Sequence, residues 1–232
     1  MSLLNQKTIE KKITLNGFGL HTGIPVRLNL LPSAPNTGII FKRTDIKTNN
    51  IIVPRFNNVI DTQLCTTLSN EFGTKVSTIE HLMGALYGLG IDNLIVETNA
   101  QELPILDGSA KIFVEKILSA GLKLSSTPIK LIKINSKVTY EEGYKSISLD
   151  KSKVASEIDF EIKYNNKIIG NQRNKINIFN DDLSEIYSSR TFCLYEDVEK
   201  LRSSGLALGG SLNNAIVLDE EKSNFVVFDI YG

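Results

Sequence analysis

The spacing of apolar residues changes along this chain, and that change constrains the fold more than any other feature. Thr8–Leu15 and Pro25–Leu31 alternate apolar with polar residues on either side of the sequence NGFGLHTG, which is the two-residue period of a β-hairpin. Ile39–Ile60 contains short β-branched runs broken by Asn and Pro, and it predicts a small extra β-element on the same sheet. Sheet structure therefore opens the chain.

Helical spacing follows these strands. Val76–Gly90, with the sequence VSTIEHLMGALYGLG, predicts a helix, and Ile91–Thr98 predicts a strand. Asp107–Leu122 carries apolar residues at helical spacing until Gly121 ends the pattern. The first half of the chain is therefore predicted to run strands, helix, strand, helix.

A domain boundary is predicted at Lys123–Pro128, because KLSSTP combines small polar residues with a proline. Beyond it the order repeats loosely. A strand, a Gly turn and a strand come first, then helical spacing in 181–187 and 195–205, then strands in 215–218 and 225–228. The sequence therefore predicts the α+β class, with two similar domains at residues 1–126 and 127–232 in the layout of an old duplication.

Composition excludes several classes of function. Lys+Arg and Asp+Glu number 26 each, so no overall positive charge attracts nucleic acid. The chain has no uninterrupted apolar run of about 18 residues and no apolar core after a basic start, so we expect neither a membrane span nor a signal peptide. Cys65 and Cys193 lack CxxC spacing and suit free thiols in a reducing compartment. We expect a cytoplasmic protein.

Glu80 and His81 stand side by side in the apolar segment at 76–90, and two interpretations of the pair are open. Ser77 and Glu80 have the spacing of a capping box, in which Glu80 only satisfies amides of the first helical turn. Alternatively, the carboxylate is a general base and the neutral imidazole is a Zn²⁺ ligand. A catalytic zinc normally has three protein ligands, and the chain has only one other histidine, His21.

Other stretches carry similar alternatives. His21 lies in GFGLHTG, whose glycines permit either close approach to a ligand or simply a tight turn. ELPILDGSA offers Asp107 or Ser109 as a helix N-cap. Arg190–Phe192 either meet a sugar or phosphate or form a solvated strand end. The glycines of GLALGGSLNNAIVL lack both the P-loop lysine and the GxGxxG spacing, which excludes a nucleotide-binding fold.

Six stretches of the chain occur in the order and approximate spacing of one family: GFGLHTG, LCTTL, STIEHLMGALYGLGIDN, ELPILDGSA, SRTF and GLALGGSLNNAIVL. The chain resembles the UDP-3-O-acyl-N-acetylglucosamine deacetylases, the zinc amidases of bacterial lipid A biosynthesis, over nearly all of its length up to Glu220. The resemblance implies two α+β domains with helices packed between two sheets, each domain carrying a small insert.

The resemblance also implies roles for individual residues. Glu80 matches the general base that activates the attacking water, and His81 matches a zinc ligand. Thr191 matches the residue that hydrogen-bonds the tetrahedral intermediate or the substrate carbonyl. The segment 192–217 matches an insert that forms an apolar passage for the substrate acyl chain. The implied substrate-binding residues are Leu20, His21, Leu64, Cys65, Phe192, Leu194, Val198, Gly210 and Val217.

By this resemblance, the reaction is hydrolysis of the N-acetyl amide of a UDP-sugar carrying a hydroxyacyl chain, by a monomeric protein with Zn²⁺ as cofactor. The family continues into an HKxxD segment that gives the second and third zinc ligands and a Gly-His that gives a catalytic histidine, and neither occurs in the 232 residues. We therefore expect a C-terminally truncated member with little or no turnover. Two alternatives are a metal-free protein that binds the acylated UDP-sugar and the product of an incomplete gene without a function of its own.

Overall fold

The structure is a computed structural model that describes residues 4–152, 156–219 and 224–225. Two compact units divide these residues. The first contains the residues up to Pro128 together with those from Ser184 onward, and the second is Ile129–Leu183. The division of the sequence into two similar domains at 1–126 and 127–232 stays a prediction.

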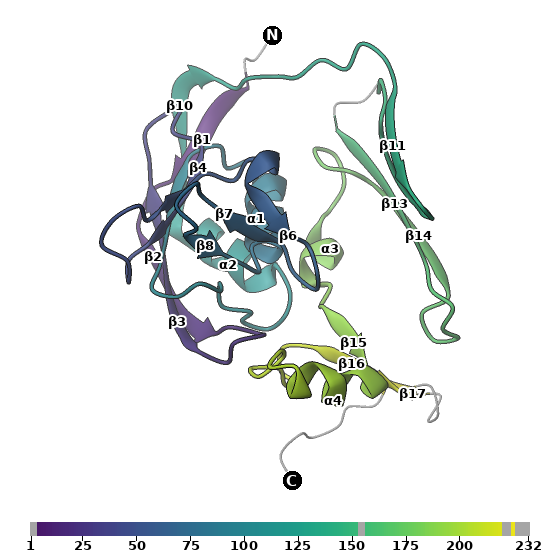
Figure 1. Cartoon of the computed structure of the whole chain (residues 1–232). Coiled ribbons are helices and arrows are strands. Elements are labelled where there is room, and N and C mark those ends of the chain that lie inside the picture. Colours follow the sequence, from purple (N-terminus) through teal and green to yellow (C-terminus); the bar gives the residue numbers. More distant parts are fainter. Residues whose placement is uncertain (1–3, 153–155, 220–223, 226–232) are drawn as a thin grey trace. The chain divides into compact units, whose positions relative to one another are not determined.

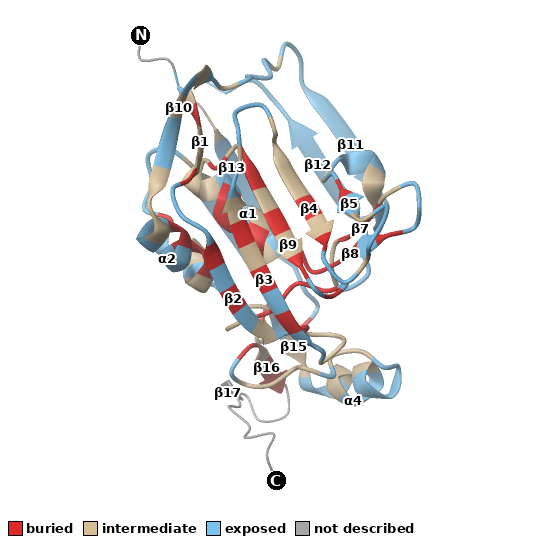
Figure 2. Ribbon diagram, turned by 90° about the vertical axis from the view of Figure 1, so that its left-hand side faces the viewer, coloured by how far each residue is buried: buried red, intermediate tan, exposed pale blue. Residues whose placement is uncertain are grey.

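A five-stranded sheet forms the body of the first unit. Its strand order is β2–β3–β9–β4–β5, and β4 and β9 are parallel while the other neighbours are antiparallel. Figure 2 shows buried positions alternating along β3 and β9, because only one face of the sheet packs against the core. The strands are β2 (Ile13–Phe18), β3 (Pro25–Pro32), β4 (Ile39–Arg43), β5 (Ile51–Ile52) and β9 (Leu94–Thr98).

The predicted hairpin is confirmed as β2 and β3, which pair antiparallel along their whole length. The beginning of Thr8–Leu15 belongs to another strand, β1 (Asn5–Ile9), which pairs with β10 (Leu122–Pro128). The predicted extra β-element is confirmed by β4 and β5, which join the main sheet. A separate sheet contains β6 (Val59–Asp61), β7 (Thr67–Ser69) and β8 (Lys75–Val76), and the 3₁₀ turn η1 (Phe56–Asn58) precedes β6.

Two helices, α1 (Glu80–Leu89) and α2 (Lys111–Ala120), lie on one face of the main sheet (Figure 1). Gly90 ends α1 with φ of 67° and Gly121 ends α2 with φ of 84°. Glycine adopts such angles without a Cβ clash, which is why both helices stop there. The buried side chains of the two helices join those of the sheet in one core: Leu82, Ala85, Leu86, Phe113, Val114 and Ile117.

The helix α1 begins later than its apolar pattern predicts. Val76 belongs to β8, and Thr78 has φ of 55°, which no helical residue adopts. Ile79 is the N-cap, and within the described chain no side-chain hydrogen bond caps the helix. The interpretation of Ser77 and Glu80 as a capping box is therefore wrong, since the chain turns between them.

A short βαβ segment completes the first unit. The strand β15 (Phe192–Leu194) pairs in parallel with β16 (Ile216–Asp219), and α4 (Tyr195–Ser203) connects them. Together with α3 (Ser184–Ser188), these elements confirm the predicted helices at 181–187 and 195–205 and the strand at 215–218. The strand β17 (Asn224–Phe225) pairs with β16, and the rest of the strand predicted at 225–228 lies outside the described residues.

The second unit consists of two β-hairpins. The first pairs β11 (Val138–Glu142) with β12 (Lys145–Leu149), and it confirms the predicted strand, Gly turn and strand. The second pairs β13 (Glu157–Lys163) with β14 (Asn171–Asn177).

Helices and several separate sheets in one chain confirm the α+β class. The finer arrangement, with helices between two sheets in each of two similar domains, stays a prediction. Within the described ranges, no helix combines the length and the apolar character that crossing a bilayer requires.

Candidate functional site

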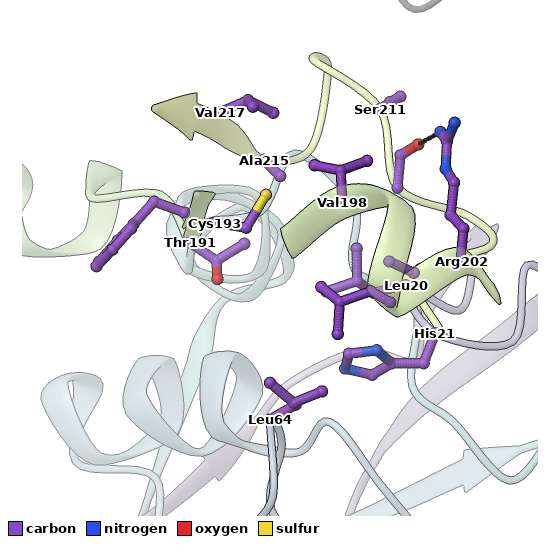
Figure 3. A pocket seen from close by; sticks show the side chains of 14 residues that line it. Leu20, His21, Leu64, Thr191, Cys193, Val198, Arg202, Ser211, Ala215 and Val217 are labelled. Carbon is purple, nitrogen blue, oxygen red and sulfur yellow. Dashed lines mark hydrogen bonds between the residues drawn. The ribbon is translucent and has the colours of Figure 1, made fainter. Parts of the chain in front are cut away.

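An apolar pocket of about 110 Å³ lies in the first unit, between the loop that follows β2 and the βαβ segment. Figure 3 shows Leu20, His21 and Leu64 on one side of it, and Cys193, Val198 and Ala215 facing them from β15, α4 and the start of β16. Two distant parts of the sequence therefore meet to enclose a space with mainly apolar walls, which is the usual character of a ligand site.

Most of the predicted substrate-binding residues line this pocket: Leu20, His21, Leu64, Phe192, Val198, Gly210 and Val217, and Thr191 lies among them. Cys65 and Leu194 do not line the pocket, although each directly follows a lining residue in the sequence, Leu64 and Cys193 respectively. Glu80 and His81 also lie outside the lining set. Their predicted roles, and those of the lining residues, are proposals.

Sequence reasoning missed several residues that the structure brings into the pocket wall. Cys193, Arg202, Ala207, Ser211 and Ala215 all line it. Their only signal in the sequence was their position inside the segment 192–217. Arg202 extends away from the apolar space and donates to the carbonyl oxygen of Gly210 at 3.4 Å (Figure 3).

Two glycine-rich loops, one at residues 19–23 and one at residues 205–210, form the pocket by close backbone contact. The amide of Leu208 donates to the carbonyl of His21 at 3.1 Å, and the amide of Gly209 donates to the carbonyl of Leu20 at 3.0 Å. A Cβ atom on Gly209 would overlap the carbonyl oxygen of Gly19. Glycine is required there because any side chain would separate the two loops.

Thr191 is held in place from both sides by backbone hydrogen bonds. Its amide donates to the carbonyl of Gly108 at 2.8 Å, and its own carbonyl accepts from the amide of Ile216 at 2.9 Å. Gly108 has φ of 81°, and a Cβ on it would overlap the backbone of Asn214. The LPILDGSA turn, which contains Gly108, thus packs directly against Thr191.

The side chain of Arg190 strengthens the same junction. Its Nε donates to the carbonyl of Asp107 at 2.7 Å, and its Nη2 donates to the carbonyl of Leu212 at 2.8 Å. Within the turn, Ser109 Oγ donates to the Asp107 carboxylate at 2.9 Å and accepts the amide of Lys111 at 3.1 Å. Ser109 therefore binds a first-turn amide of α2 as predicted for a cap, although the N-cap position itself belongs to Ala110.

Glu80 and His81 form the start of α1. Glu80 is exposed, and its Oε2 accepts the amide of Thr66 at 3.2 Å, so the carboxylate reaches the loop that also carries Leu64. Burial lowers the pKa of the His81 imidazole, against the opposing influence of the Glu80 and Asp107 carboxylates. His81 is therefore neutral near pH 7, with a lone pair free to bind a metal.

His21 and Cys65 shift each other's pKa. The Cys65 thiol raises the pKa of His21 despite burial, and Glu102 and Glu80 add to the effect. In return, His21 lowers the pKa of Cys65, with Thr67 and Thr78 contributing. Both ring nitrogens of His21 are buried and have no hydrogen-bond partner of normal geometry among the described residues, so the contact with the Cys65 thiol is a long or poorly aligned hydrogen bond.

This arrangement defines a class of protein: an α+β hydrolase, in which the exposed carboxylate of Glu80 contacts the loop of an apolar pocket and stands beside the partly buried, neutral imidazole of His81. The family model for UDP-3-O-acyl N-acetylglycosamine deacetylase matches residues 6–225. The chain belongs to this family.

Curated relatives agree with the family match. A protein from Haemophilus ducreyi, named UDP-3-O-acyl-N-acetylglucosamine deacetylase, is 43% identical over 224 residues, which cover 94% of this chain and 72% of that protein. A protein of the same name from Nautilia profundicola is 44% identical, with 94% of this chain and 74% of that protein covered. One from Pasteurella multocida is 43% identical, with coverage of 94% and 72%. The resemblance carried by the six motif blocks is therefore confirmed.

Proposed function

We propose that the site of this chain serves the hydrolytic removal of acetate from the N-acetyl amide of UDP-3-O-(hydroxyacyl)-N-acetylglucosamine, a step of lipid A biosynthesis. The observation that carries the proposal is an apolar pocket lined by Thr191 and by Leu64, whose loop contacts Glu80, in a chain of the deacetylase family. The proposal includes a monomeric protein that meets this substrate in the cytoplasm.

The acyl chain of the substrate suits the pocket walls. Leu20, Leu64, Val198, Leu201 and Val217 present apolar side chains to it. Each methylene of an acyl chain that leaves water there contributes roughly 0.8 kcal/mol. The acyl chain therefore supplies binding energy that holds the amide at a fixed place relative to Thr191.

We assign two side chains of this chain, those of Glu80 and Thr191, to the reacting amide. Glu80 takes a proton from the attacking water, and its exposure leaves it open to that water. The Thr191 hydroxyl donates to the carbonyl oxygen as negative charge develops on it, and the backbone bonds of Thr191 hold the main chain that carries this hydroxyl. The carbon–nitrogen bond of the tetrahedral intermediate then breaks, and the nitrogen receives the proton that Glu80 took from the water, which gives the amine and acetate.

Zinc is the proposed metal, and when bound it polarises the amide carbonyl and makes water more acidic. His81 fits one ligand position, because burial keeps its ring neutral. Among the described residues, no group of three His, Cys, Asp or Glu side chains is placed to hold a metal ion. The resemblance assigns the other two ligands to an HKxxD segment, a motif that the 232 residues do not contain.

Substrate binding to the 232-residue chain tests the proposal. We expect addition of UDP-3-O-(hydroxyacyl)-N-acetylglucosamine to shift the amide NMR signals of Leu20, His21 and Thr191. Val198→Phe, which fills the pocket, should abolish these shifts, and Leu118→Phe on the exposed side of α2 should not. Equal binding by both variants would place the acyl chain elsewhere and refute the proposal.

The metal assignment has its own test. Zn²⁺ should move or broaden the imidazole signals of His81, and His81→Ala should abolish the shift that Zn²⁺ causes in the amide signal of the neighbouring Glu80. Any acetate release should disappear on chelation and in Glu80→Gln. Acetate release that survives both treatments would contradict the roles given to these residues.

Metal-free binding of the acylated UDP-sugar is the second candidate function. It is favoured by the position of the pocket, whose lining residues do not include Glu80 or His81. Substrate affinity that a chelator leaves unchanged, together with undetectable acetate release, would support it.

A further inference from the structure

Glu102 is a charged residue with only 1% of its surface exposed. Its Oε1 accepts the amide of His21 at 2.8 Å and the hydroxyl of Thr78 at 3.1 Å. Its Oε2 accepts the amide of Thr22 at 2.8 Å and the hydroxyl of the same residue at 2.7 Å. Four donors thus compensate a carboxylate whose burial would otherwise be very costly.

These four donors come from two separate parts of the site. His21 and Thr22 belong to the loop that forms one wall of the pocket. Thr78 is two residues before Glu80, and its φ of 55° marks the turn into α1. One buried carboxylate therefore links the pocket loop to the segment that leads to Glu80 and His81.

Backbone bonds hold Glu102 itself in this place. The amide of Ser77 donates to the carbonyl of Gln101 at 2.8 Å, and the amide of Leu103 donates to the carbonyl of Ser77 at 3.1 Å. On the other side, a Cβ on Gly19 would overlap the Glu102 carboxylate. Gly19 on one side and the backbone of Ser77 on the other thus both pack closely around Glu102.

We infer that Glu102 is a positioning residue of the deacetylation site, which fixes the pocket loop relative to the start of α1. It acts through His21, Thr22 and Thr78, because its carboxylate is buried and occupied by their four donors. The inference rests on the function proposed for the site, but the arrangement it describes can be measured without turnover.

Glu102→Gln is the first variant, because glutamine keeps the size of glutamate but not its charge or its two acceptor oxygens. Whichever way the amide is oriented, its NH₂ group faces donors that glutamate satisfied. Glu97→Gln is the matched control. It also removes one carboxylate charge, from a partly buried side chain, but that carboxylate binds Lys42 at 3.0 Å and not the pocket loop.

The readout is NMR of the two imidazoles, since His21 and His81 are the only histidines in the chain. In Glu102→Gln we expect His21 to titrate at lower pH than in the wild type, because the Glu102 charge helps to raise its pKa. We also expect the amide signals of Thr22, Thr78, Glu80 and His81 to move. The control should leave all of these unchanged.

Affinity gives a second readout. Binding of a long-chain 3-hydroxy fatty acid should weaken by about tenfold in Glu102→Gln, the order expected when one charge-assisted hydrogen bond is lost. A Glu102→Gln protein with native secondary structure and with wild-type imidazole titration, amide shifts and affinity would overturn the inference.

Thr78→Val covers the case in which Glu102→Gln does not fold, since it removes only one donor and keeps the side-chain shape. It should move the Glu80 and His81 amide signals, and unmoved signals would overturn the inference. If the wild type binds no fatty acid at all, the proposed function fails, and the NMR measurements still decide the role of Glu102.

Discussion

Gly209→Ala is expected to open the pocket from its backbone side. The new Cβ would overlap the carbonyl oxygen of Gly19 and lie 3.1 Å from the Cα of Gly23. Both neighbours are backbone atoms, so the strain cannot be relieved by rotating a side chain. The two loops must therefore move apart to relieve the overlap.

The cost has two parts. Overpacking of this kind typically costs about 1–3 kcal/mol. The separation also stretches the bonds from Leu208 to His21 and from Gly209 to Leu20, and each lost hydrogen bond costs about 1 kcal/mol. With both bonds lost, we expect a loss of about 3–5 kcal/mol in the free energy of unfolding, a large fraction of the roughly 5–15 kcal/mol typical of a domain.

Urea unfolding followed by far-UV circular dichroism measures this loss, and fatty-acid binding measures the state of the pocket. Gly84→Ala is the control, because Gly84 lies inside α1 with no atom within 4 Å of the new Cβ. That variant should gain roughly 0.5–1 kcal/mol from alanine's higher helix propensity. If Gly209→Ala unfolds and binds like the wild type, the close approach of the two loops does not shape the pocket.

Three further predictions concern the thiols, the Arg190 junction and turnover. Iodoacetamide should alkylate Cys65 at lower pH than Cys193, because His21 lowers the pKa of Cys65 while burial raises that of Cys193. His21→Gln should move the midpoint pH of Cys65 alkylation upward. Equal midpoint pH values for the two cysteines, measured by peptide mass spectrometry, would contradict this. Arg190→Lys should destabilise the chain by about 1–2 kcal/mol in urea unfolding, because lysine cannot reach the carbonyls of both Asp107 and Leu212. Arg173→Lys, at an exposed position, is the control. If both variants lose the same free energy of unfolding, the two bonds of Arg190 do not stabilise this junction. The 232-residue chain should release little or no acetate from the acylated UDP-sugar even with added zinc, since it offers only two histidines; chelator-sensitive turnover that is lost in Glu80→Ala would refute this expectation.

The sequence by itself determined the local elements and the family of this protein. Alternation of apolar and polar residues fixed the β2–β3 hairpin, and helical spacing ending in Gly121 fixed α2. Both patterns arise within one element, so they are readable from the order of residues alone. The six motif blocks also indicated the deacetylase family, which the family match over residues 6–225 confirms.

Only the tertiary structure decided how the site is assembled. The start of α1 follows from the turn at Thr78, and Glu80 binds the amide of Thr66 in place of the capping role that spacing had suggested. Glu102 meets His21 across 81 positions of sequence, and Cys193 enters the pocket only because β15 lies beside β16. Hydrophobic periodicity records which face of an element is buried, but it does not record which distant residue that face will meet.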